Sequence, residues 1–336
     1  MNRPGLTLAF LLLLSCSAAA EVPTGLLKDV VFTHYSELSS SGELARRLLS
    51  PFDALRMQQH AAADAGRKQT LSLEQERFAM YVPAKEPPNG YALLVYVPPS
   101  DQGEVPSRWT RVLDRHGFIL VTAANSGNDT GAFDRRAALA VLAATNVIGL
   151  YHVDPQRVYV SGFSGGSRMA MRLALGYPDL FHGALLDAGS DAIGDTVPPP
   201  PKPLLEQFQT SSRLIYLTGQ QDDFHLDMDS RSRHALPEWC ITDVETIHMP
   251  WLGHELAEPG AMERALVALE QHHPPAADNL DACRAHLQQA LDVQLDQVRQ
   301  WKQSGESDKA LILLRRIDMH YGGLAAPRSI ELATQR

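Results

Sequence analysis

DPQRVYVSGFSGG, residues 154–166, places the motif G-x-S-x-G between a predicted strand and a predicted helix. Residues 157–160 are typical of a buried strand, and residues 167–175 have a helical pattern. The motif alone is common in glycine-rich loops. Between a strand and a helix it indicates a turn too tight for side chains on either side of Ser164, which exposes the serine oxygen above the sheet edge. The helix N-terminus that follows favours negative charge there.

Strand and helix patterns alternate on both sides of this motif. The predicted strands cover residues 27–35, 77–82, 91–97, 118–123, 157–160, 183–186, 214–217 and 244–249. The predicted helices cover residues 106–115, 134–150, 167–175 and 261–272. Such alternation is typical of right-handed crossover units. The sequence therefore predicts an α/β fold with a mostly parallel, doubly wound sheet and helices on both faces.

The chain changes character after residue 273, where two prolines precede a tail without strand patterns. Two apolar stripes recur in the tail at helical spacing: Leu287, Leu291, Leu295 and Val298, then Ala310, Leu314, Ile317 and Tyr321. They predict a C-terminal helical hairpin, similar to one tetratricopeptide-like unit, over residues 274–336. An array of such repeats needs about three units to be stable alone. We therefore expect the hairpin to pack on a catalytic domain spanning residues 21–273, and it offers a surface for contact with a protein.

Composition narrows the class of protein. The 336 residues are 44% apolar and 21% charged, which excludes disordered, collagenous and disulfide-framework proteins. The formal net charge is −9 and there is no basic tract, which argues against sequence-independent binding of nucleic acid. The chain has no Walker loop, dinucleotide fingerprint or His-Glu-x-x-His motif, so we expect neither a cofactor nor a metal.

Residues 1–20 have the features of a signal peptide. Arg3 precedes an apolar run over residues 6–14. Ala18-Ala19-Ala20 then provides small residues at the positions that a signal peptidase recognises. The run is shorter than the about 20 residues of a membrane-spanning helix. We expect cleavage and a periplasmic or secreted protein. A second interpretation takes residues 13–16 as a lipoprotein box with Cys16 as the lipidated residue.

Cys240 and Cys283 are the cysteines that remain after cleavage. In an oxidising compartment an even pair suggests a disulfide, which would stabilise the fold by roughly 3 to 4 kcal/mol. Two buried thiols are the alternative. Neither cysteine lies in a C-x-x-C motif or beside a histidine cluster, so metal binding is not expected at this pair.

A serine hydroxyl needs a base to take its proton, so a histidine and an orienting carboxylate should follow Ser164. Around a G-x-S-x-G turn of this kind, the chain order is serine, acid, histidine. The strand at 214–217 runs into Asp222 and Asp223, of which Asp222 is preferred, three residues after Gly219. The strand at 244–249 leads to His254, the predicted base.

Other residues compete for these roles. His225 and His234, expected in a loop before the last strand, are the rival bases. A solvated acidic loop is the alternative interpretation of the nearby carboxylates, which are Asp222, Asp223, Asp227 and Asp229. A calcium site at these residues is less favoured.

Acyl transfer also requires N–H donors for the developing oxyanion, each worth roughly 3 to 4 kcal/mol of the barrier. The backbone amide of Gly165, directly after the serine, is the first expected donor. The second should come from the loop after the strand at 91–97. Pro98 and Pro99 have no N–H, so Ser100 and Asp101 are the candidates.

With these residues the chain resembles the α/β-hydrolase superfamily, and within it secreted serine esterases of the polyhydroxybutyrate depolymerase and feruloyl esterase type. The resemblance rests on residues 154–166 and on Gly253-His254, and it covers residues 90–272. It implies a hydrolase of small or polymeric carboxylic esters with Ser164 as nucleophile, His254 as base and Asp222 as orienting acid. Those esterases often carry His-Gly after the oxyanion strand, whereas this chain has prolines there, so the substrate stays open.

Two functions from other classes compete with an esterase. A peptidase of the prolyl oligopeptidase type would use the same three residues, but the chain lacks the propeller-sized extension that would gate peptides. A non-catalytic binding or scaffold protein would keep the fold and hold a partner through residues 274–336.

Overall fold

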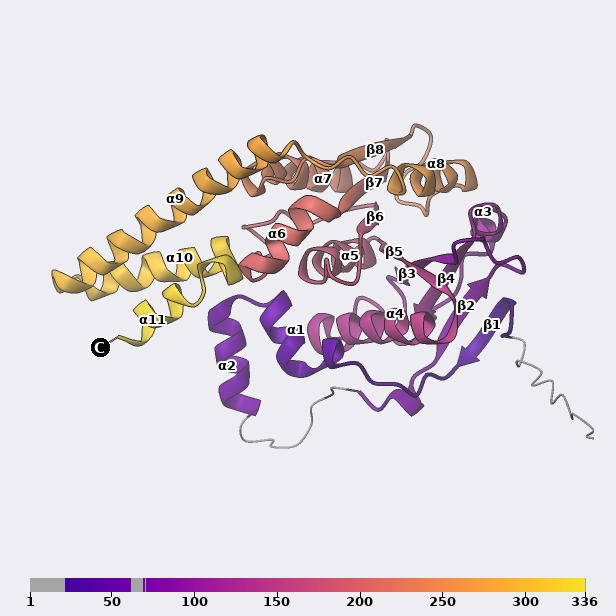
Figure 1. The fold of residues 1–336 in the computed structure, drawn as a ribbon, viewed down its shortest axis with the longest axis horizontal. Helices are drawn as coiled ribbons and strands as arrows, with labels where there is room; N and C mark the ends of the chain where they lie inside the picture. The colour runs from indigo at the N-terminus through magenta and orange to yellow at the C-terminus, as the bar shows by residue number, and fades with distance from the viewer. Residues whose placement is uncertain (1–21, 62–68, 70, 336) are drawn as a thin grey trace, which may run out of the picture.

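The computed structural model describes residues 22–61, 69 and 71–335 (Figure 1). The predicted signal peptide and Cys16 lie outside these residues. No helix in the described ranges is both long enough and apolar enough to cross a membrane.

One eight-stranded sheet forms the centre of the fold, in the order β1-β2-β4-β3-β5-β6-β7-β8. β2 pairs antiparallel with β1 and β4, and every other neighbouring pair is parallel. The strands are β1 (Gly25–Val30), β2 (Phe78–Val82), β3 (Tyr91–Val97), β4 (Phe118–Ala123), β5 (Val153–Phe163), β6 (Gly183–Asp187), β7 (Arg213–Gly219) and β8 (Val244–Met249). β3, β4 and β7 are buried along their whole length because helices cover both faces of the sheet.

Helices lie on both faces of this sheet, as Figure 1 shows. One core cluster joins one face to α1, α4, α5 and α6, and a second joins the other face to α3 and α8. The helices are α1 (Ser41–Leu48), α2 (Pro51–Ala61), α3 (Thr110–His116), α4 (Ala138–Leu150), α5 (Gly165–Gly176), α6 (Lys202–Ser211), α7 (Asp223–Ala235), α8 (Pro259–Leu269), α9 (Ala277–Gln303), α10 (Ser307–Ala325) and α11 (Arg328–Thr334). The predicted α/β class with a mostly parallel sheet is confirmed.

The turn between β5 and α5 carries Ser164, and the turns after β7 and β8 carry Asp222 and His254 in that chain order. A serine on such a turn, followed by an acid and a histidine at successive strand ends, is the arrangement of the α/β-hydrolase fold. The chain has this fold, so the resemblance to the superfamily is confirmed at the level of the fold.

The prediction of a loop between β7 and β8 was wrong, because most of this segment is helix α7. No apolar stripe in the sequence indicates this helix, because its buried side chains are the polar Asp229 and Ser232. The solvated acidic loop was therefore also wrong. Asp222 and Asp229 are only 7% and 2% exposed, and His225 and His234 lie on the helix rather than in a loop.

The opening segment also contains structure that the prediction lacked. β1 ends at Val30, before the predicted residue 35, and α1 and α2 follow. The Ser40 hydroxyl accepts a hydrogen bond from the Glu43 amide at the start of α1. A serine followed three residues later by glutamate is a helix-start signal, so this helix could have been recognised.

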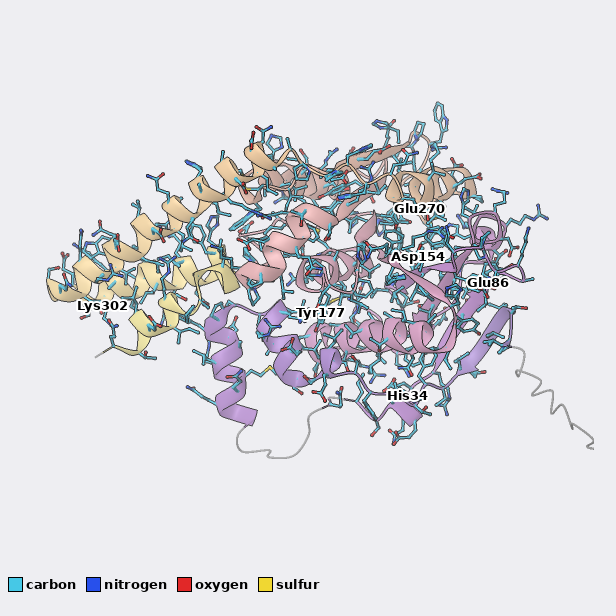
Figure 2. The ribbon with its side chains drawn as sticks, in the orientation of Figure 1. His34, Glu86, Asp154, Tyr177, Glu270 and Lys302 are labelled. Atoms are coloured by element: carbon cyan, nitrogen blue, oxygen red, sulfur yellow. A yellow bond between two sulfur atoms is a disulfide. The ribbon has the colours of Figure 1, made fainter. Side chains whose placement is uncertain are left out.

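The predicted C-terminal hairpin is present as α9 and α10, with α11 after it, and it projects from the body in Figure 1. All eight side chains of the two predicted stripes are buried. α10 bends at Gly322, where a Cβ would lie 2.4 Å from the Pro199 carbonyl oxygen. Lys302, labelled in Figure 2, donates a hydrogen bond to the Leu332 carbonyl and so joins α9 to α11.

A disulfide between Cys240 and Cys283 ties α9 to the body. The two cysteines are separated by 43 residues, so the bond closes a long loop of the unfolded chain. Of the two alternatives for these cysteines, the disulfide is therefore the correct one, and they are not free thiols.

We expect Cys283→Ser, or reduction of the disulfide, to lower the free energy of unfolding by about 2–4 kcal/mol, because the unfolded chain regains the entropy of an open loop. Urea unfolding with and without reductant measures this effect. Reductant should leave the Cys283→Ser protein unchanged, which controls for other effects of the reagent. An equal unfolding midpoint for oxidised and reduced protein would contradict the expectation.

Candidate active site

Ser164 stands on a sharp turn between β5 and α5. Its backbone has φ 55° and ψ −123°, a conformation that non-glycine residues rarely adopt. Its amide donates a hydrogen bond of 2.8 Å to the carbonyl of Asp187, at the end of the neighbouring strand β6. The serine is therefore fixed at the carboxyl edge of the sheet.

The glycines of the motif are required by close approach of the backbone. A Cβ on Gly162 would lie 2.2 Å from the Gly166 carbonyl carbon, and one on Gly166 would lie 2.0 Å from the Val97 carbonyl oxygen. Both distances are shorter than any van der Waals contact. Helix α5 consequently begins directly against the end of β3, as the tight turn in the sequence predicts.

The structure brings the three predicted side chains into one hydrogen-bonded chain. Ser164 Oγ lies 3.1 Å from His254 Nε2, and His254 Nδ1 lies 2.7 Å from Asp222 Oδ2. The His254 side chain is 40% exposed, so substrate and solvent can reach it, whereas the carboxylate is 7% exposed. The neighbouring Asp223 is exposed, and among the described residues no hydrogen bond or ion pair joins it to His254.

A second imidazole shares the same carboxylate. His225 Nδ1 lies 2.8 Å from each oxygen of Asp222, and the His225 ring stacks on the His254 ring with centroids 4.1 Å apart. No hydrogen bond joins His225 to Ser164 among the described residues. The rival base His234 instead contacts the Ser230 carbonyl of its own helix. Of the three candidate histidines, His254 is the one that is hydrogen-bonded to Ser164.

Burial would raise the pKa of Asp222, but hydrogen bonds from His225 and His254 outweigh it and hold the pKa below its ordinary value. The carboxylate is thus ionised when it accepts from both rings. Asp222, His225 and His254 are also close enough to share a metal ion. In this structure the Nδ1 atom of each histidine is engaged by the carboxylate.

Asp187 is a functional neighbour that sequence reasoning missed. Its Oδ2 accepts a hydrogen bond of 2.9 Å from the Ala257 amide, three residues after His254, while its Oδ1 is buried with no hydrogen-bond partner among the described residues. The residue thereby anchors the histidine loop. Burial raises the pKa of this carboxyl to about 8, although the Ala257 amide opposes the shift. Its position at the end of β6 was the available signal.

The candidate oxyanion donors lie in two different places. Gly165 is the first residue of α5, so no carbonyl four residues earlier in the helix accepts from its amide. Asp101 accepts from the Gly127 and Asn125 amides and braces that loop. Ser100 lines a separate cavity with Phe163. The cavity beside Ser164 is lined instead by Asn128, whose side-chain atoms would lie 2.2–2.9 Å from a Cβ on Gly165.

No family model and no curated protein matches the chain. Solved structures with a similar fold include an S-formylglutathione hydrolase from Staphylococcus aureus, at 12% identity and TM-score 0.46 over 58% of this chain and 92% of that one. An acetyl xylan esterase from Aspergillus awamori matches at 14% identity and TM-score 0.45, over 58% and 94%. Dipeptidyl peptidase 4 from Porphyromonas gingivalis matches at 16% identity and TM-score 0.45, over 61% of this chain but 35% of that one.

The raised pKa of Asp187 predicts a dependence of stability on pH. In the unfolded chain the carboxyl ionises near 3.8, and in the folded chain near 8. Between these values the folded state holds the additional proton, so the free energy of unfolding falls as pH rises, by up to about 1.4 kcal/mol per pH unit. Asp187→Asn keeps an acceptor for the Ala257 amide and should remove this part of the slope.

Urea unfolding of both proteins at about pH 5 and about pH 8 measures the difference. Asp223→Asn removes a carboxylate from an exposed neighbour of Asp222 and should keep the wild-type slope. Equal slopes for the wild type and Asp187→Asn would show that the Asp187 carboxyl is not protonated in the folded protein.

Proposed function

We propose that this protein is an exported serine hydrolase that cleaves carboxylic esters through an acyl-enzyme intermediate. The observation that carries the proposal is the hydrogen-bonded chain from Ser164 through His254 to Asp222, with distances of 3.1 and 2.7 Å. Nucleophile, base and orienting acid at these distances are the parts that acyl transfer requires. Export rests on the signal-like residues 1–20.

In the acylation half, His254 Nε2 takes the proton of the Ser164 hydroxyl as Oγ attacks the acyl carbon. The imidazolium that forms is stabilised by ionised Asp222, which accepts from Nδ1–H. The amide of Gly165 donates to the oxyanion at the N-terminus of α5. When the intermediate collapses, His254 gives its proton from Nε2 to the departing alcohol, and the acyl group stays on Ser164.

In the deacylation half, water takes the place of the alcohol. His254 Nε2 removes a proton from the water, whose oxygen attacks the acyl carbon. Collapse returns the proton to Ser164 Oγ and releases the acid. Asp222 is held by both histidines throughout, so its geometry does not depend on His254 alone.

We expect Ser164→Ala, His254→Gln and Asp222→Asn each to lower kcat for p-nitrophenyl esters by about 10³-fold or more, because each removes one member of the relay. Two neighbours provide matched controls: Asp223→Asn beside the acid and His234→Gln on α7 should stay within about twofold of wild type. Wild-type turnover no faster than that of Ser164→Ala would refute the esterase proposal. Turnover of amides but not esters would favour the peptidase.

Asn128 is the second oxyanion donor in this proposal, since its side-chain amide lies against Gly165 in the cavity of Ser164. Asn128→Ala, and the isosteric Asn128→Asp that lacks the N–H donors, should each lower kcat by about 10²-fold with little change in KM. Unchanged melting temperatures would separate this effect from unfolding. If kcat is unaffected in both, Asn128 is not the second oxyanion donor.

A further inference from the structure

The cavity beside Ser164 is unusually cationic for an acidic protein. It measures about 700 Å³, and four arginines but only two aspartates line it, in a chain with a net charge of −9. An excess of one sign in a cavity raises the local concentration of ligands of the opposite sign. A ligand can pair with these arginines only where protein carboxylates leave them unpaired.

Arg136 is the most deeply buried of the four arginines, at 5% exposure. It donates from Nε to the Ser126 carbonyl and from Nη2 to the Pro98 carbonyl, both at 2.9 Å. No carboxylate pairs with it among the described residues, and no acceptor for its Nη1 is found there. A buried guanidinium is normally paired, since the burial of an isolated charge is costly.

Nearby charges do not neutralise Arg136. Arg168 and Arg172 also line the cavity, but both donate to the same carboxylate, that of Asp191, at 2.8 and 2.9 Å. Burial lowers the pKa of Arg136, and the positive charge of Arg168 lowers it further, although Asp101 opposes the shift. Two guanidinium groups thus share one carboxylate, and a third has none.

The remaining lining charges lie toward solvent. Arg231 pairs with Asp227 at 2.7 Å, and its side chain is 66% exposed. Asp195 is exposed at the rim. The unneutralised charge therefore lies at an arginine cluster of Arg136, Arg168 and Arg172, in which Arg136 is buried and the side chains of Arg168 and Arg172 are 45% and 27% exposed.

We propose that this arginine cluster is an anion subsite, and that the preferred substrate is an ester whose non-reacting part carries a carboxylate. A guanidinium has five N–H donors in a planar fork that matches a carboxylate. The inference rests on the proposed esterase function, because Ser164 and Gly165 line the same cavity. The carboxylate lies on the acyl side or on the alcohol side of the ester, and the test distinguishes the two.

The experiment compares two matched pairs of esters. Mono-p-nitrophenyl glutarate against its methyl ester places or removes a carboxylate on the acyl side. 4-Acetoxybenzoate against its methyl ester does the same on the alcohol side. We expect the wild type to favour the anion by about tenfold or more in kcat/KM for one pair. A preference for the neutral ester in both pairs would overturn the inference while leaving the esterase function in place.

Substitutions of the arginines test which side chains cause the preference for anionic esters. Arg136→Gln should lower the anionic-to-neutral ratio by about tenfold or more, and the ratio corrects for any general loss from the loops that Arg136 holds. The Arg168 side chain does not bind the loops that Arg136 holds, so Arg168→Gln should lower the same ratio without disturbing them. This variant tests the subsite if Arg136→Gln does not fold. Arg299→Gln removes an exposed positive charge on α9 and should leave the ratio unchanged. A ratio unaffected by the first two changes would overturn the subsite.

A binding measurement separates this inference from the esterase function. In the Ser164→Ala protein, monomethyl glutarate should bind more tightly than dimethyl glutarate by calorimetry, and adding Arg136→Gln or Arg168→Gln should remove the difference. If the wild type turns over no ester but this difference persists, the subsite stands and the esterase proposal fails. Equal binding of the two glutarates in Ser164→Ala would overturn the subsite.

Discussion

The geometry of the site depends on one constraint: Ser164 is held in a backbone conformation that a serine does not favour by itself. A φ of 55° at a non-glycine residue costs on the order of 1–3 kcal/mol. The surrounding structure imposes it, because the Asp187 carbonyl accepts the serine amide, and because α5 presses Gly166 against the end of β3. The sheet therefore positions the hydroxyl before any substrate arrives, and His254 and Asp222 need only reach a point that is already fixed.

Strands were predictable where burial on both faces makes them continuous apolar runs, as in β3 and β4, which have the predicted bounds. β8 also has the predicted bounds, although it is a partly exposed edge strand. The elbow at Ser164 follows from glycines that leave no room for a Cβ. Helix α7 was not predictable in the same way, because it buries Asp229 and Ser232 rather than an apolar stripe. Periodicity of apolar residues carries no signal for a helix packed through polar side chains.

The residues of the candidate site also differ in whether the sequence predicts them. The order of serine, acid and histidine can be read along the chain, so Ser164 and His254 could be chosen from sequence. Asp222 and Asp223 have the same chemistry, and only the start of α7 separates the buried acid from the exposed one. The environment of Asp187 and Arg136 depends on tertiary neighbours such as Ala257 and Pro98. No local pattern reveals these contacts, because the partners lie far away in sequence.

Buried charge links the stability of this fold to its chemistry. Asp222 is kept ionised because His225 and His254 supply donors, whereas Asp187 receives only the Ala257 amide and is driven toward its neutral form. Arg136 extends the same logic to the opposite sign: its donors hold Pro98 and Ser126, which fixes the loops beside Ser164, while no carboxylate in the described part of the chain pairs with its charge. An apolar side chain could fill the space but could donate to neither carbonyl. The guanidinium thus braces these loops, and the free energy cost of burying its charge falls when an anion enters the cavity.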